Sequence, residues 1–258
     1  QAHQSIPMAK RAMFILAASA PAPLSFDDEG SPSRTLIERA YAQLRDDIVE
    51  GRLTPGAKLR VEHLKDRYDV GAGTLREAIT RLVSDALVVA EGQRGFRVAP
   101  IAVGDLEDLT RLRVHIEIEA LRQSIRSGDA LWREQLRLAY DELSAVEQPI
   151  RPQDRRRWEQ LNNRFHETLI AAGASAWTFR VLRLLSRHGE RYRRYAMALP
   201  NSGRDVHKEH TEIFELAMAG QDARAALALE AHIRNTPDVL MRALRDGVSV
   251  FQRAEPVA

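Results

Sequence analysis

Apolar side chains recur every three or four residues along most of the chain, and this spacing predicts helices. The first helix is expected after an N-cap at Ser33 or Thr35 and before Gly51, which ends it. Its apolar stripe is Leu36, Ala40, Leu44, Ile48 and Val49. A turn over residues 53–56 leads into a second, shorter helix over Val61–Tyr68. The ordered part of the chain is therefore expected to begin with two helices joined by a tight turn.

A third helix and a β-hairpin follow in the pattern. Gly71 and Gly73 interrupt the chain before a helix that is expected to begin at Thr74. Its inward residues are Leu75, Ile79, Leu82 and Val83, whereas Arg76, Thr80 and Arg81 are left outside. Residues 87–90 and 96–98 are expected to form strands around a turn with glycines where a positive φ is needed. This order of elements is typical of a winged helix-turn-helix.

Such a module suggests a set of DNA contacts. It inserts the N-terminal part of its third helix into the major groove, where Arg76 could reach guanine edges or a phosphate. For any single arginine a solvated or ion-paired role is the simpler interpretation, but the ordered set favours DNA. The expected contact residues are Thr74, Arg76, Arg81, Arg94, Gly95 and Arg97.

From Val103 onward the pattern is helical throughout, without a further strand signal. Glycine and proline breaks predict a bundle of six or seven helices, the first capped by Asp105. The expected fold class is therefore mainly α, with three helices and a β-hairpin followed by an all-α bundle. The expected segments are a disordered leader (1–33), a DNA-binding domain (34–100), a linker (101–104), a helical effector-binding domain (105–246) and a tail (247–258).

Three histidines lie on or beside the apolar stripes of separate helices in this second domain. His166 follows Asn162 by one helical turn, and His210 and His232 occupy apolar faces further along the chain. Three imidazoles with Asn162 as a weak oxygen donor could hold a metal and leave positions open for a ligand. The alternative is that each histidine is a hydrogen-bonded core residue.

The composition of the chain excludes several classes of protein and of metal site. The chain has 258 residues, no cysteine and a formal net charge of +2. The absence of cysteine excludes disulfide frameworks and cysteine-ligated metals and fits a cytoplasmic protein. No apolar run is long enough to cross a bilayer. Lys10 and Arg11 before an apolar stretch resemble a signal peptide, but the prolines that follow favour a disordered leader.

Spaced residues in the first domain resemble the GntR family. They are Tyr41-x-x-Leu44-Arg45-x-x-Ile48-x-x-Gly51-x-Leu53-x-Pro55-Gly56-x-x-Leu59, Leu75-Arg76-Glu77-Ala78-Ile79-x-x-Leu82 and Gly95-x-x-Val98. This resemblance implies a homodimer that binds a short, roughly palindromic operator. Ala72 departs from the family's pattern, because many relatives carry a basic residue at this position.

The second domain resembles the FCD effector domain of the FadR subfamily. The matching residues are Asn162-x-x-x-His166, Glu209-His210-x-x-Ile213 and Ala231-His232-Ile233. The resemblance implies a divalent metal held by Asn162, His166, His210 and His232, with zinc or nickel favoured, and a carboxylate effector completing the metal's shell. Asn162 stands where an aspartate is commoner. Arg113 matches the family's effector-contacting arginine, although a surface ion pair with Glu117 is an equal alternative.

These observations predict a ligand-responsive transcription regulator that senses a small organic acid through a metal-containing helical domain. In a second interpretation the chain binds DNA but the metal or the histidine cluster is purely structural. A metal-dependent hydrolase is a third interpretation, since an open coordination position also activates water. No acid–base residue is placed beside the histidines by the sequence, so an enzyme is not expected.

Overall fold

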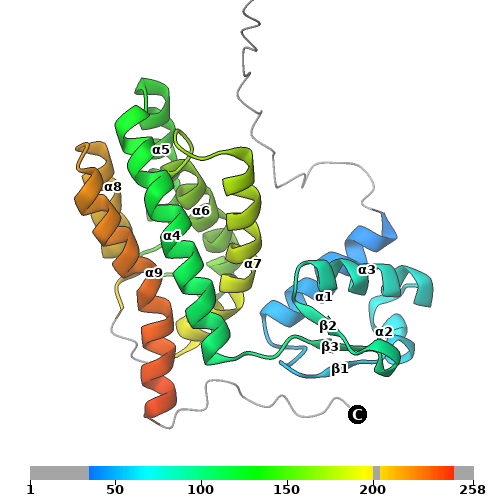
Figure 1. Cartoon of the computed structure of the whole chain (residues 1–258). Coiled ribbons are helices and arrows are strands. Elements are labelled where there is room, and N and C mark those ends of the chain that lie inside the picture. The colour runs from blue at the N-terminus through cyan, green and yellow to red at the C-terminus, as the bar shows by residue number, and fades with distance from the viewer. Residues whose placement is uncertain (1–34, 200–203, 247–258) are drawn as a thin grey trace, which may run out of the picture. The chain divides into compact units, whose positions relative to one another are not determined.

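The computed structural model describes residues 35–199 and 204–246. The expected leader and tail, and Ser33 as a possible cap, lie outside these residues. The described residues form a winged helix-turn-helix and an all-helical bundle, which confirms the mainly α fold class (Figure 1). None of their helices combines the length and apolar character that a membrane span requires.

The winged helix-turn-helix packs three helices against a small antiparallel sheet with strand order β1-β3-β2. The third helix begins at Ala72 rather than at Thr74, because Gly71 has the extended backbone of an N-cap. The first strand was not expected from the sequence. The elements are α1 (Leu36–Val49), β1 (Lys58–Leu59), α2 (Val61–Tyr68), α3 (Ala72–Ser84), β2 (Val88–Ala90) and β3 (Phe96–Val98).

The wing turn depends on glycine. Between β2 and β3 the chain makes one short 3-10 turn over Gly92–Arg94. Gly92 and Gly95 have φ angles of 56° and 91°. Residues with a Cβ atom rarely adopt such positive φ angles, whereas glycine does so without steric cost. The expected positive φ at the hairpin glycines is therefore confirmed.

Helices α1 and α2 are tied together by one buried carboxylate. Asp47 on α1 accepts hydrogen bonds from the Tyr68 hydroxyl at 2.5 Å and from Arg67 at 2.8 Å. Arg52, just beyond α1, donates to the same carboxylate at 2.6 Å. Burial and the bond to Asp47 raise the pKa of Tyr68, so this hydroxyl stays a donor.

The start of α1 is closed by a capping box. The Thr35 hydroxyl accepts a hydrogen bond from the Glu38 amide at 3.2 Å, and the Glu38 carboxylate accepts one from the Thr35 amide at 2.9 Å. Replacing Thr35 with alanine is expected to lower the free energy of unfolding by about 1 kcal/mol, because one amide loses its partner. Urea unfolding measures this, with Thr35→Ser as the matched control. Equal stability of the alanine and serine variants would contradict the role of the cap.

Six helices form the bundle within the described residues, in agreement with the expected six or seven. They are α4 (Val103–Ser127), α5 (Ala130–Ser144), α6 (Arg155–Leu169), α7 (Ala176–Ala198), α8 (Val206–Met218) and α9 (Asp222–Arg245). Two expectations at the start of α4 were wrong. Ala102, not Asp105, is the N-cap, and Asp105 instead accepts a hydrogen bond from Tyr192 at 2.9 Å. The linker expected over 101–104 is shorter, because α4 already begins at Val103.

Long α4 lies beside both α7 and α9, while α5 packs on α6 and α8 on α9 (Figure 1). The core between them contains Phe165, Leu121, Leu136 and Ile213, all fully buried. At Gly173 the loop after α6 approaches α4 so closely that a Cβ would lie 2.6 Å from the Ala120 carbonyl oxygen. The end of α6 is thereby held close to α4.

Candidate metal and ligand site

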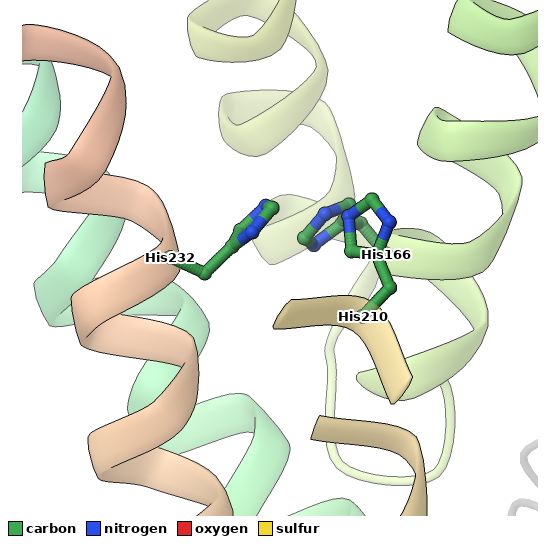
Figure 2. Close-up of side chains that lie close together, drawn as sticks. All are labelled: His166, His210 and His232. Atoms are coloured by element: carbon green, nitrogen blue, oxygen red, sulfur yellow. The ribbon is translucent and has the colours of Figure 1, made fainter. Parts of the chain in front are cut away.

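The structure brings together the three histidines that the sequence singled out. His166 comes from α6, His210 from α8 and His232 from α9, and Figure 2 shows their rings turned toward one another. One nitrogen from each lies within 4.8 Å of the others. His210 is fully buried and His232 is 8 % exposed. Their apolar helix faces thus converge on one interior point.

Glu147 orients His210. This buried glutamate lies in the loop between α5 and α6, and its carboxylate accepts hydrogen bonds from His210 Nδ1 and Trp158 Nε1, both at 2.8 Å. With the proton on Nδ1, the Nε2 atom of His210 carries a lone pair. That Nε2 atom is buried and has no hydrogen-bond partner among the described residues. A buried acceptor without a donor is rare, and a metal ion would satisfy it.

His232 has a similar carboxylate partner. Its Nδ1 lies 2.8 Å from Glu209 Oε2, and Arg204 donates to the same oxygen at 2.7 Å. Arg204 also donates to the His232 carbonyl at 3.0 Å, which fixes the helix beside the ring. His166 is held less tightly, since its Nδ1 is 3.8 Å from Glu117. Two of the three rings therefore have their orientation set by a carboxylate.

His166 and His232 are neutral in this environment. Burial lowers the pKa of His166 well below its ordinary value, and the adjacent His232 and His210 lower it further. Burial and the adjacent His210 do the same to His232. A neutral imidazole offers a lone pair, which is the form that binds a metal. Asn162, 3 % exposed and one turn before His166, adds an amide to the set. This donor set fits a late transition metal.

Two cavities border both Asn162 and His166. The larger of these two, of about 190 Å³, is also bordered by His232. The smaller shares Arg113, Asn162 and His166 with it and extends toward Glu117. The apolar lining of the larger cavity is Ile150, Trp158, Ala196, Met197, Val206, Ile233 and Val239. The site thus combines a polar end at the histidines with an apolar body.

Arg113 lines both cavities and also pairs with Glu117. Its Nε donates to the Glu117 carboxylate at 2.7 Å, and the two side chains are only 13 % and 6 % exposed. The pair expected from the sequence is therefore present, but it is buried in the site rather than on the surface. Glu117 holds the guanidinium at the cavity wall.

Several site residues had no sequence signal. Glu147 lies in a loop that has no periodic pattern, and Arg155 and Arg204 flank helix starts. Arg193 on α7 lines the larger cavity and donates to Glu159 at 3.0 Å. Helical periodicity identifies the face of a helix but not the neighbour across the bundle. Only the fold shows that these residues share a site.

The candidate DNA contacts occupy one helix and the wing. Arg76 and Arg81 are exposed on α3, where Arg81 lies 3.4 Å from Glu77, and Thr74 is half-buried in the first turn. Arg94 is exposed at the wing turn, one residue before Gly95. Arg97 is held locally, since it donates to Glu91 at 2.8 Å and to the Gly56 carbonyl at 3.0 Å. Arg76 and Arg94 therefore present the most accessible cations of the set.

Comparison with known families assigns both halves of the chain. Residues 36–98 match the bacterial regulatory proteins of the gntR family, and residues 108–235 match the FCD domain. The first range covers the winged helix-turn-helix, and the second contains all three histidines.

Full-length relatives are regulators as well. The chain is 43% identical over 212 residues to the uncharacterised HTH-type transcriptional regulator BphR of Paraburkholderia xenovorans (strain LB400), covering 80% of this chain and 86% of that protein. It is 28% identical to the HTH-type transcriptional repressor GlaR of Escherichia coli (strain K12), covering 79% and 95%. A GntR regulator structure from Rhodococcus sp. RHA1 shares the fold, with a TM-score of 0.64 at 22% identity over 80% of this chain and 98% of that one. The chain therefore belongs to the GntR family, and it is a DNA-binding transcription regulator with an FCD domain rather than an enzyme.

Proposed function

We propose that this regulator senses a small organic acid through a divalent metal held by His166, His210, His232 and Asn162. The observation that carries the proposal is the buried, unpartnered Nε2 of His210 beside two further neutral imidazoles. Zinc and nickel suit this donor set best. When bound, such an ion supplies a Lewis-acidic cation for a carboxylate oxygen. The chain's own residues orient the ligand around it.

Arg113 is the residue we assign to the effector carboxylate. Its guanidinium lies at the junction of the two cavities, and Glu117 holds it there. A planar guanidinium binds a carboxylate through charge-assisted hydrogen bonds. The apolar lining of the larger cavity receives the body of the acid.

DNA binding is proposed to use the exposed face of α3 and the wing. Arg76 reaches base edges, Thr74 and Arg81 flank it, and Arg94, Gly95 and Arg97 of the wing contact the backbone. A homodimer would place two such modules on a palindromic operator. Effector binding then favours one of two dimer arrangements and so changes operator affinity.

An exposed apolar stripe supports the dimer. Trp177, Val181 and Leu184 follow one another at helical spacing on α7 and are 70 %, 40 % and 40 % exposed. Arg180 lies over the Trp177 ring at 4.9 Å. Large apolar side chains grouped on one exposed helix face are typical of a surface that a protein partner covers. We assign this face to a second copy of the chain.

The decisive measurement is the metal content of the purified full chain in chelator-free buffer. We expect one divalent ion per chain, which His166→Ala and His210→Ala lose. His115→Ala is the control, because His115 is exposed and its Nδ1 lies 3.0 Å from the Arg111 carbonyl oxygen, one turn back on the same helix. Operator binding is then compared with and without carboxylates. Metal-free protein that still folds and binds DNA would show that the histidines are structural and would overturn the proposal.

A further inference from the structure

The larger cavity is lined by four arginines, and three of them already have a carboxylate. Arg113 pairs with Glu117 at 2.7 Å, Arg193 with Glu159 at 3.0 Å and Arg204 with Glu209 at 2.7 Å. The side chains of all three pairs are largely buried. These pairs are therefore fixed parts of the cavity wall and contribute little net charge to it.

Arg155 is the fourth arginine and differs from the others. It is half-buried at the start of α6, and it borders the same cavity. Its Nε is buried without a hydrogen-bond partner among the described residues. A buried donor of a charged group is costly to leave unpaired. An acceptor that enters the cavity would satisfy it.

The charge around the cavity favours a ligand with more than one negative charge. The ligand set proposed above is neutral, because its members are imidazoles and an amide, so the charge of a divalent ion stays uncompensated. Arg155 adds another positive charge. Glu147, buried against His210, offsets only part of this sum. A dianion balances the remainder, whereas a monoanion does not.

Arg155 and Asn162 lie at separate positions along the cavity wall that α6 provides, so they can contact two separate acidic groups of one ligand. They are seven residues apart on α6, which places them on the same face and about 10 Å apart along the helix axis. Apolar side chains, among them Trp158 and Val206, line the cavity that both residues border. A cavity of about 150 Å³ accommodates benzene, so the 190 Å³ here suits a short carbon chain or a single ring.

We propose that the effector carries two acidic groups, and that Arg155 binds the one that lies away from the histidines. The ligand class is a short dicarboxylate, with one carboxylate at the histidines and Arg113 and the other at Arg155. This inference rests on the proposed sensing function and adds Arg155 as a second carboxylate-binding residue, called the second anchor below. Arg155 is thus the residue that distinguishes a diacid from a monoacid.

The test is calorimetric titration of the zinc-loaded full chain. The probes are linear dicarboxylates of roughly four to eight carbons, a range set by the helical separation, and monocarboxylates of the same lengths. At least one dicarboxylate is expected to bind about tenfold more tightly than its monocarboxylate partner. In Arg155→Gln this advantage is expected to disappear. Arg157→Gln, an exposed arginine on the same helix, is the matched control and should keep it.

The outcomes separate the two proposals. Binding of monocarboxylates and dicarboxylates with equal affinity, or an unchanged dicarboxylate advantage in Arg155→Gln, would overturn the second anchor and leave metal-based sensing intact. Failure of every carboxylate to bind the zinc-loaded chain would overturn both. Zinc content and circular dichroism are recorded for each variant. If Arg155→Gln does not fold, Arg155→Met removes both the charge and the Nε donor while keeping an unbranched side chain, and an unchanged dicarboxylate advantage in that variant would also overturn the role of Arg155.

Discussion

Replacing Glu147 with glutamine is expected to weaken zinc binding by about 10- to 100-fold. The glutamate carboxylate accepts hydrogen bonds from both His210 and Trp158. Both bonds end on the same oxygen, Oε1, and a glutamine oxygen at that position is neutral and therefore a weaker acceptor for the His210 Nδ1–H than a carboxylate oxygen. If its amide faces His210, the ring is driven to the tautomer that carries its proton on Nε2. The lone pair that we assign to the metal is then lost.

Competition with a chromophoric zinc chelator measures this change. Glu142→Gln is the matched control, because Glu142 is an exposed glutamate near the end of α5 that pairs with Arg164. Its zinc affinity should equal that of the unmodified chain. Unchanged affinity in Glu147→Gln would show that Glu147 supports packing only and does not orient a ligand.

Affinity for operator DNA is expected to fall by about a thousandfold or more between 50 and 200 mM salt. A dimer that contacts six or more phosphates releases a counterion for each contact, and salt opposes that release. The exposed Arg94 of each wing is assigned to one such contact. Arg94→Gln should therefore reduce the slope of log affinity against log salt by about two per dimer.

Fluorescence anisotropy on an operator selected from a random duplex library provides the measurement. Arg111→Gln is the control, since Arg111 is an exposed arginine on α4 that pairs with Asp108. Its slope should not change. An affinity that varies little with salt would contradict backbone contacts by this module. An Arg94→Gln slope equal to that of the control would remove the wing from the interface.

Local patterns predicted the helices well and the short strand poorly. The second helix has the expected bounds, Val61–Tyr68, because its apolar residues repeat at one period and its ends carry clear breaks. Strand β1 contains only Lys58 and Leu59, too few residues to show alternation. Helix α3 begins at Ala72 because the glycine at 73 is accepted in its first turn, although in the sequence it is typical of a break.

In the candidate site, too, some residues could be predicted from helical periodicity and others could not. His166, His210 and His232 could be found because each lies on or beside an apolar stripe, and convergence of such faces is what a bundle core requires. Glu147 and Arg155 could not be found. Their importance comes from neighbours on other helices, which periodicity along one helix does not report. Residues that face a site across the bundle depend on tertiary packing.

The three histidines belong to three different helices and lie at least 22 residues apart in the sequence, so their nitrogens meet only in the folded bundle. An ion that binds the native bundle but not the unfolded chain stabilises it, by about 2.7 kcal/mol at a concentration one hundred times the dissociation constant. The abundance of folded regulator in a cell then follows the supply of metal. Metal scarcity would remove the sensor through unfolding and proteolysis, independently of any effector.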